Sequence, residues 1–377
     1  MSEFLFIKTF PEQNTQLWLF FDRQILLTFD KKFKPMLANT LTRTYQEAEK
    51  ILHDNYKKLM QNEGWDFISI IEDPDYGYYF EVGVNDFDKE VEKIENHSYP
   101  YEIRNYRKDG RSVSFFIPAE FLYGELLHDL RVTIHKENLT KYYQDRAEKL
   151  NKGCSGDASN CDVLEKRKMG HLLANVENDG EGSIGCFLED KLGNKYALTA
   201  YHVIRGTRNG DFSDIGDEIH SPPVNGKLLG KLSWYQYDKY ADIALIKLDD
   251  DVEIEKGSVC CFQLKEYIGS AVLPGSIVKI CSSVDNIQTR CGIVISTCCV
   301  VRKNDNHREC IFGLIQTTNL GQPGDSGSVV ANMQNEAVGL LVRDRGDQCS
   351  YFMPLDILQK TISLRLDDTQ FEFKKFY

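Results

Sequence analysis

The chain has 377 residues, a formal net charge of -12 and a hydrophobic content of 42%. This length predicts two domains of ordinary size, each able to bury a core of its own. The acidic balance argues against a nucleic-acid partner, because binding to phosphate backbones needs a basic face.

The amino-terminal segment, Met1 to Lys8, carries no basic leader, and Lys8 and Pro11 interrupt its apolar run early. No apolar run in the chain approaches the roughly 20 residues that a membrane span needs. We therefore expect a cytoplasmic chain that makes no use of a membrane.

The chain has eleven cysteines, an odd number. Without an export signal, we expect them to be reduced and to pack as small apolar side chains. Cys260–Cys261 and Cys298–Cys299 are adjacent pairs, and adjacent side chains of a strand point to opposite faces, so neither pair would chelate one ion. One zinc site stays open as an alternative, formed by Cys298 or Cys299 with His307 and Cys310 around a hairpin. Otherwise we expect no metal and no cofactor.

Residues 1 to 150 are predicted to form an α+β domain of unknown role. Aromatic and β-branched runs bounded by turn residues predict strands over residues 4–10, 16–21, 25–29, 67–71 and 78–84. Apolar residues at helical spacing predict a helix over 43–62 that ends near Gly64. Further helices are expected from Pro118, with Leu130 still on its inner face, and over about 138–150.

No sequence motif in this first domain indicates a catalytic or metal-binding site. Its histidines share no ligand spacing: His53, His97, His128 and His135. The acidic run from Asp86 to Glu95 is typical of a solvated helix face. We expect the domain to bind a partner or to regulate the rest of the chain.

Residues 151–161 are small and polar with no periodic pattern, and a charged run follows them up to residue 170. This composition predicts a linker over residues 151–170. From 171 to 377 short, turn-punctuated strands follow one another, which predicts an all-β sandwich or barrel, and about a dozen such strands would suit two six-stranded barrels. The expected strands cover residues 183–188, 195–201, 227–234, 243–248, 259–264, 276–281, 292–301, 310–316, 328–332, 337–342 and 350–353. A helix is expected over Leu355 to Ile362, after Pro354.

Three segments of this second domain supply the residue types of an activated serine. Leu198-Thr199-Ala200-Tyr201-His202 places His202 at the end of a buried strand, and Asp242-Ile243-Ala244-Leu245 places Asp242 at the mouth of another. Gly324-Asp325-Ser326-Gly327 places Ser326 on a tight, glycine-flanked turn. A serine hydroxyl needs a base within hydrogen-bond reach and a third group that orients the base. These are the residue types that such a site requires.

At these segments the chain resembles the chymotrypsin-like (trypsin-like) serine peptidases over about residues 170–365. The three signatures occur in that family's order, His202, Asp242 and Ser326. The resemblance implies a double β-barrel and a serine endopeptidase that acts on proteins or peptides through an acyl-enzyme. Ser326 would be the nucleophile, His202 the general base and Asp242 the group that orients it. The amides of Gly324 and Ser326 would form the oxyanion hole.

The same resemblance assigns a substrate pocket by place in the motif. One wall would be formed by Asn319, Leu320, Gly321 and Gln322, and the strand that pairs with substrate by Val342, Arg343 and Asp344. Leu320 stands where trypsins carry an acidic residue, which argues against a simple preference for arginine or lysine, although Asp344 leaves such a preference open.

Several positions depart from the secreted members of that family. Val203 and Gln322 stand where those enzymes usually have cysteines, which agrees with a reducing compartment. Secreted members mature when a new Ile- or Val-led terminus pairs with the aspartate before the serine; Asp325 is present here but no Ile-Val-Gly-Gly occurs. We therefore expect activation through the first domain or a partner.

Two rival interpretations remain open. Taken singly, His202, Asp242 and the Gly-Asp-Ser-Gly turn each suit an ordinary structural role, so a catalytically silent barrel serving as a scaffold or binding protein is the main alternative. A lipase or esterase is the less favoured one, because those enzymes place serine, acid and histidine in that order on an α/β sheet.

Overall fold

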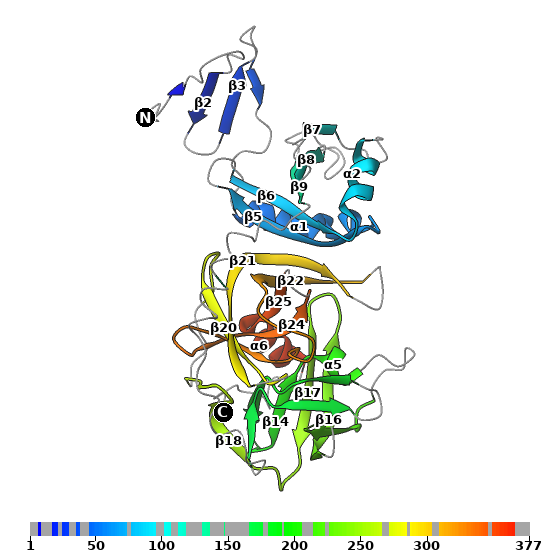
Figure 1. Cartoon of the computed structure of the whole chain (residues 1–377), viewed down its shortest axis with the longest axis vertical. Helices are drawn as coiled ribbons and strands as arrows, with labels where there is room; N and C mark the ends of the chain where they lie inside the picture. Colours follow the sequence, from blue (N-terminus) through cyan, green and yellow to red (C-terminus); the bar gives the residue numbers. More distant parts are fainter. Residues whose placement is uncertain are drawn as a thin grey trace. The chain divides into compact units, whose positions relative to one another are not determined.

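The chain divides into two compact units in a computed structural model (Figure 1). Unit 1 comprises residues 1–138 with 298–308, and unit 2 comprises residues 139–297 with 309–377. The structure describes residues 7–8, 17–21, 25–29, 35–37, 45–73, 77–95, 102–106, 112–117, 130–135, 147, 166–175, 180–190, 192–205, 214–222, 226–265, 271–284, 287–303, 309–345 and 349–365.

Unit 1 begins with an antiparallel four-stranded sheet. Its strands follow one another in chain order: β1 (Ile7–Lys8), β2 (Leu17–Phe21), β3 (Ile25–Phe29) and β4 (Pro35–Leu37). The expected strands over 16–21 and 25–29 correspond to β2 and β3. Of the expected strand over 4–10, only residues 7–8 lie within the described residues.

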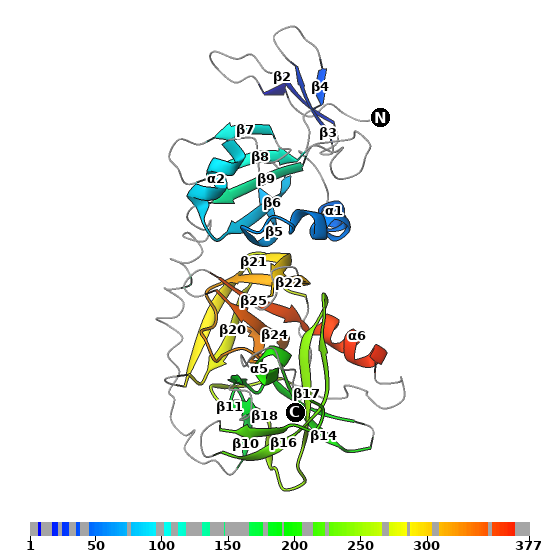
Figure 2. The same ribbon diagram turned by 90° about the vertical axis from the view of Figure 1, so that its right-hand side faces the viewer.

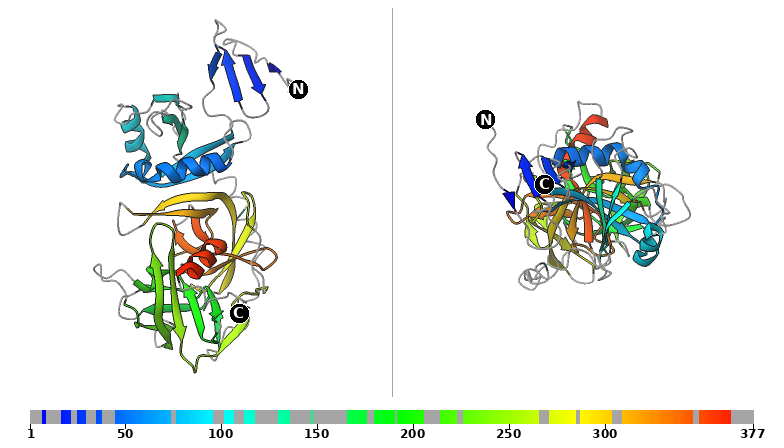
Figure 3. Two further views of the ribbon diagram at one scale, coloured as in Figure 1. Left: turned by 180° about the vertical axis from the view of Figure 1, so that it is seen from behind. Right: turned by 90° about the horizontal axis from the view of Figure 1, so that it is seen from above.

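Helix α1 (Tyr45–Leu59) packs one face against the larger sheet of unit 1, as the view from behind shows (Figure 3). Its buried positions recur at the spacing of one helix face: Ala48, Ile51, Leu52, Asn55, Tyr56 and Leu59. The helix covers β5 (Trp65–Asp73) and β6 (Gly77–Val84), which extend the strands expected there. This sheet continues through β9 (Leu130–His135), β8 (Ser112–Ile117) and β7 (Glu102–Tyr106), with β9 parallel to β6.

Two expectations for unit 1 are wrong in part. The acidic run forms α2 (Phe87–Glu95), but Glu90 is only 1% exposed, because the indole Nε1 of Trp65 donates to it (2.7 Å) and Lys93 pairs with it (3.1 Å). Leu130 begins β9 and does not close a helix. The rest of the helix expected from Pro118 lies outside the described residues, and so does the helix over 138–150 apart from Ala147, which is helical.

Glu81 is a second buried carboxyl of unit 1, in β6 between Thr133 of β9 and Ser69 of β5 in the strand register. It is 3% exposed, and burial raises its pKa to about 7. A carboxyl with this pKa carries its proton for part of the time at neutral pH, because the protein interior disfavours the charged form.

The long strand β21 (Gln288–Arg302) contains residues of both units. Its first residues pair with β20 (Ile277–Ser282), while Cys299 to Val301 pair with β5 in unit 1. Arg302 ends the strand, is 4% exposed and donates to the carbonyls of Met60 (2.6 Å), Asn62 (3.2 Å) and Trp65 (2.9 Å). A guanidinium suits this place because its fixed fork presents several donors at once.

Unit 2 begins with a seven-stranded antiparallel sheet in the order β12-β11-β15-β16-β17-β14-β13. The strands are β11 (Leu172–Asn175), β12 (Gly180–Ser183), β13 (Cys186–Glu189), β14 (Lys195–Thr199), β15 (Glu218–Ser221), β16 (Lys227–Tyr237) and β17 (Asp242–Leu248). The central strand β17 is buried on both faces except at Lys247, which explains its nearly continuous apolar sequence. The strand expected over 183–188 is two strands, separated at Ile184 and Gly185.

Six further strands close into a barrel in the order β20-β23-β24-β25-β22-β21, because β21 also pairs with β20 (Figure 2). The new strands are β22 (Cys310–Thr318), β23 (Val329–Asn332), β24 (Ala337–Asp344) and β25 (Cys349–Pro354). The barrel interior is filled by Val272, Val278, Ile280, Val294, Ile315, Leu320, Val330, Val338, Leu341 and Phe352. Helix α6 (Leu355–Arg365) packs against β24 and β25. The predicted architecture, an α+β region followed by a double β-barrel and a carboxy-terminal helix, is confirmed, with the six-stranded barrel closed and the seven-stranded sheet forming a half-barrel.

A small third sheet of unit 2 corrects two further expectations. It contains β10 (Arg167–Met169), which begins within the range expected to be linker, β18 (Ile254–Val259) and β19 (Phe262–Gln263). Cys260 and Cys261 form the turn between β18 and β19, where a single strand was expected. The turn brings Cys261 to β20, and Cys261 is joined to Cys281 by a disulfide, so the expectation that every cysteine is a thiol is wrong.

No helix within the described ranges is long and apolar enough to cross a membrane. In the same part of the chain, no three or more His, Cys, Asp or Glu side chains gather in a way that could hold a metal ion. Cys298 and Cys299 are buried at the end of β21, and the thiol of Cys299 contacts Ser69 Oγ (3.2 Å). His307 of the alternative zinc site lies outside the described residues.

Candidate active site

His202 and Asp242 are in direct contact in unit 2. Strand β14 ends at Thr199 and is followed by the short helix α5 (Tyr201–Arg205), which carries His202 in its first turn. Asp242 is the first residue of β17, the strand that pairs with β14. Its Oδ2 lies 2.6 Å from His202 Nδ1, and its Oδ1 accepts a hydrogen bond from the backbone N of His202 (3.0 Å).

The exposure of the pair differs between its members. The side chain of Asp242 is 4% exposed, whereas that of His202 is 33% exposed. Two contacts from one carboxylate fix both the backbone and the ring of His202. Because Nδ1 contacts Asp242, proton transfer by this ring would involve the other nitrogen, Nε2.

Ser326 lies on a turn whose shape depends on glycine. Asp325 N donates to the carbonyl of Gln322 (2.9 Å), and Gly324 has a φ of 97°. A positive φ at the third position, after proline, is the arrangement of a type II turn. A Cβ at 324 would approach Val284 Cγ2 to 2.8 Å, so both conformation and space favour glycine there.

Ser183 of β12 donates hydrogen bonds to two backbone carbonyls near Ser326. Its backbone N donates to the carbonyl of Ser326 (2.8 Å), and its Oγ donates to the carbonyl of Gly324 (3.1 Å). The amides of Asp325, Gly327 and Ser328 are bonded to carbonyls of the protein. Within the described part of the chain, the N–H groups of Gly324 and Ser326 have no acceptor. Two unused donors therefore lie next to the serine hydroxyl on a half-exposed turn.

Asp325 is fully buried beside the turn and faces Arg290 of β21. Arg290 Nη1 lies 4.0 Å from Asp325 Oδ2, which also accepts a bond from Gln322 N (3.0 Å), while Asp325 Oδ1 has no hydrogen-bond partner among the described residues. Burial raises the pKa of Asp325 to about 6, against the opposing effects of Ser282, Gln322 and Arg290. The carboxylate is therefore ionised at neutral pH and takes up a proton as the pH falls below about 6.

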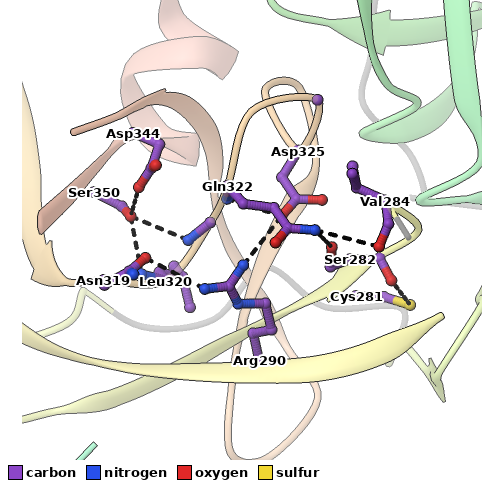
Figure 4. A network of polar contacts seen from close by, with 12 residues as sticks. Cys281, Ser282, Val284, Arg290, Asn319, Leu320, Gln322, Asp325, Asp344 and Ser350 are labelled. Atoms are coloured by element: carbon purple, nitrogen blue, oxygen red, sulfur yellow. Dashed lines mark hydrogen bonds and ion pairs between the residues drawn. The ribbon is translucent and has the colours of Figure 1, made fainter. Parts of the chain in front are cut away.

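The residues expected to line a substrate pocket differ in exposure, and Figure 4 labels four of them, Asn319, Leu320, Gln322 and Asp344. Leu320 and Val342 are 0% and 3% exposed, and Leu320 belongs to the core of the closed barrel. The half-buried residues are Asn319, Gln322, Arg343 and Asp344. Gly321 is buried, and a Cβ there would approach Leu341 Cδ2 to 2.6 Å.

The sequence patterns do not identify three residues near the proposed site: Ser183, Arg290 and Ser350. Each is a common residue type in a strand, distant in sequence from Ser326. Arg290 Nη2 reaches Asn319 Oδ1 (3.4 Å), and Ser350 Oγ contacts the chain at Leu320 and Gly321 (2.9 and 3.1 Å). Only the strand register brings Ser183 and Arg290 to the turn and Ser350 to the segment before it, and no local sequence pattern marks these three residues.

No family model matches the chain. Among curated proteins, "Serine protease Do-like HtrA" of Lactococcus lactis subsp. cremoris is 28% identical over 178 residues, which is 45% of this chain and 40% of that protein. The protein of the same name from Lactococcus lactis subsp. lactis is 26% identical over 190 residues, 50% of this chain and 40% of that protein. About half of the chain is therefore similar in sequence to these serine proteases. The similarity spans two fifths of the length of these relatives.

Solved structures of proteases also match part of the chain. Thermobifida fusca Protease A is 17% identical, with a TM-score of 0.41, 52% of this chain covered and 95% of that one. Nocardiopsis Protease (NAPase) is 16% identical, with the same TM-score and the same shares covered.

Proposed function

We propose that this chain is a serine endopeptidase that hydrolyses peptide bonds of proteins or peptides through an acyl-enzyme. The observation that carries the proposal is the double contact of the Asp242 carboxylate with His202, together with the two unused amides beside Ser326. Base orientation and oxyanion binding are the two tasks that a serine nucleophile cannot perform for itself.

In this mechanism Ser326 Oγ attacks the substrate carbonyl carbon while His202 Nε2 takes its proton. The imidazolium then gives that proton to the leaving amine, and a water molecule repeats the sequence to hydrolyse the acyl-enzyme. Asp242 keeps the proton of the neutral imidazole on Nδ1 and stabilises the imidazolium that forms.

The amides of Gly324 and Ser326 would stabilise the tetrahedral intermediates. Charge develops on the carbonyl oxygen as Ser326 attacks, and donors fixed beforehand stabilise that charge without reorganising. Ser183 supports this role because it holds the carbonyls of the same two residues. The reaction assigned to these residues is acyl transfer and needs no cofactor.

A fluorophosphonate probe tests the proposal directly. Ser326 Oγ attacks the phosphorus and fluoride leaves, so we expect wild-type protein to gain one phosphonyl group on Ser326, located by mass spectrometry of peptides. Ser326→Ala should stay unlabelled, and Ser328→Ala, which changes a buried serine two residues away, should label like the wild type. A wild type that neither takes up the probe nor cleaves a peptide library would favour the silent scaffold instead.

We further infer that residues 1–150 form a regulatory domain, joined through a linker that ends before β10 (Arg167–Met169) to a peptidase domain. The support is that β21 contributes its last residues to unit 1 and also carries Arg290, the partner of Asp325 in unit 2. A partner bound to unit 1 would act on the turn of Ser326 along this strand. Activation would then need no new amino terminus.

Arg302→Met tests this regulatory role in the full chain. The substitution removes three bonds between the end of β21 and residues 60–65 of unit 1, so we expect the rate of fluorophosphonate labelling to fall by about tenfold, the size of a typical coupling between sites. Glu90→Gln is the matched control, because Glu90 is as buried in unit 1 but bonds to Trp65 and Lys93, outside β21. Equal labelling rates for wild type and Arg302→Met would contradict regulation through β21.

A further inference from the structure

Ser350 occupies a fully buried position of β25 opposite Asp344 of β24. Its Oγ accepts hydrogen bonds from the backbone N of Leu320 (2.9 Å) and of Gly321 (3.1 Å), and donates to Asp344 Oδ1 (2.7 Å) (Figure 4). The hairpin of β24 and β25 therefore meets the chain at Leu320 and Gly321, about 30 residues away in sequence, at one hydroxyl.

This arrangement uses the whole hydrogen-bonding capacity of the hydroxyl. A serine Oγ has one proton to donate and two lone pairs to accept with. Both lone pairs receive backbone N–H groups, so the proton has to go to Asp344. The carboxylate thus sets the rotation of the hydroxyl, and the hydroxyl sets the position of residues 320–321.

The chain from Leu320 to Ser326 has a second, separate anchor. Gln322 Nε2 donates to Ser282 Oγ (3.3 Å) and to the carbonyl of Val284 (3.2 Å), and Gln322 N donates to Asp325 (3.0 Å). With Ser183 on the other side, these contacts hold the turn of Ser326 independently of Ser350. The Ser350 hydroxyl by contrast holds the segment that precedes the turn.

We propose that Ser350 is a positioning residue for substrate binding, which acts through the backbone of Leu320 and Gly321 and depends on Asp344 for its orientation. This inference rests on the proposed peptidase function. The inference goes beyond the proposed function because it assigns two separate supports. Ser350 would hold the backbone of Leu320 and Gly321 as a wall for substrate, while Gln322 and Ser183 hold the turn that carries Ser326. Loss of the hydroxyl should loosen the wall and leave the turn in place.

The test compares Ser350→Ala with wild type in peptide hydrolysis and in labelling by a small fluorophosphonate. The alanine leaves two buried N–H groups without an acceptor, so we expect KM to rise by about 30-fold, with kcat and the labelling rate within about threefold of wild type. Ser350→Thr keeps the hydroxyl and should restore KM. A purely structural role would reduce the amount of active protein, which lowers the apparent kcat and leaves KM unchanged.

Thr317→Val provides the matched control. Thr317 is as buried as Ser350, and its Oγ1 donates to the backbone carbonyl of Ser350 (3.3 Å), so this change removes a neighbouring bond and leaves the Ser350 hydroxyl in place. We expect it to leave KM unchanged. An equal rise of KM in Thr317→Val would overturn the inference.

Two further outcomes separate this inference from the proposed function. A wild type that labels and cleaves, with KM unchanged in Ser350→Ala, overturns the role of Ser350 alone. A wild type that neither labels nor cleaves overturns both. If Ser350→Ala does not fold, Ser350→Cys takes its place, because a thiol is a weak acceptor for the N–H groups of Leu320 and Gly321; KM should then rise by about tenfold, and an unchanged KM overturns the inference.

Discussion

Substitution of His202 by alanine is expected to lower kcat by about 10⁶-fold. Without the imidazole, the Ser326 hydroxyl has no base to take its proton during attack, and the leaving amine has no acid to protonate it. Asp242 cannot replace the base, because its carboxylate is buried and lies behind the imidazole, on its Nδ1 side. The measurement is steady-state hydrolysis of a peptide that the wild type cleaves.

His220→Ala is the control for this experiment. His220 is a half-buried histidine of β15 in the same seven-stranded sheet, and its Nδ1 contacts the carbonyl of Gly226 (3.2 Å). It should keep kcat within about threefold, since it has no part in the proposed reaction. A His202→Ala protein with more than about one hundredth of the wild-type kcat would rule out His202 as the general base.

The sequence located the central strands of unit 2 because their apolar patterns are strong. Strand β17 is buried on both faces, so its run from Ile243 to Leu248 is apolar at almost every position. The motifs at His202, Asp242 and Ser326 are also local: His202 follows the end of β14, Asp242 begins β17, and Ser326 follows a turn. Patterns that a short segment carries by itself are the ones that sequence reasoning can find.

The errors arise where a contact distant in sequence decides the structure. Glu90 belongs to an acidic run that is typical of a solvated helix face, yet its carboxylate accepts a hydrogen bond from the indole of Trp65 and is buried. The turn at Cys260 and Cys261 contains neither glycine nor asparagine, so no turn signal marks it, and its pairing with Cys281 depends on the fold. Leu320 was assigned to a pocket wall by its place in a motif, whereas its side chain fills the barrel core. Only the backbone of Leu320, which is hydrogen-bonded to Ser350, can then form part of a substrate-binding wall.

The substitution Asp242→Asn is expected to lower kcat by about 10⁴-fold while the protein stays folded. The new amide side chain would have one acceptor oxygen and one NH₂ group in place of two acceptor oxygens. If its oxygen keeps the bond from His202 N, its NH₂ faces Nδ1, and His202 must then carry its proton on Nε2. That tautomer cannot take the proton of Ser326.

Asp190→Asn is the control that separates the change of the His202 tautomer from the general effect of losing a buried carboxylate. Asp190 is 7% exposed, comparable with Asp242 at 3%, and accepts bonds from Leu192 N, Asn194 and Tyr196 around the turn between β13 and β14. We expect Asp190→Asn to lower thermal stability and to leave kcat within about threefold. For Asp242→Asn the reverse pattern is expected, with near-native melting and little hydrolysis. A fall in kcat of less than about tenfold would mean that Asp242 does not select the tautomer of His202, and that the contact at Nδ1 serves structure alone.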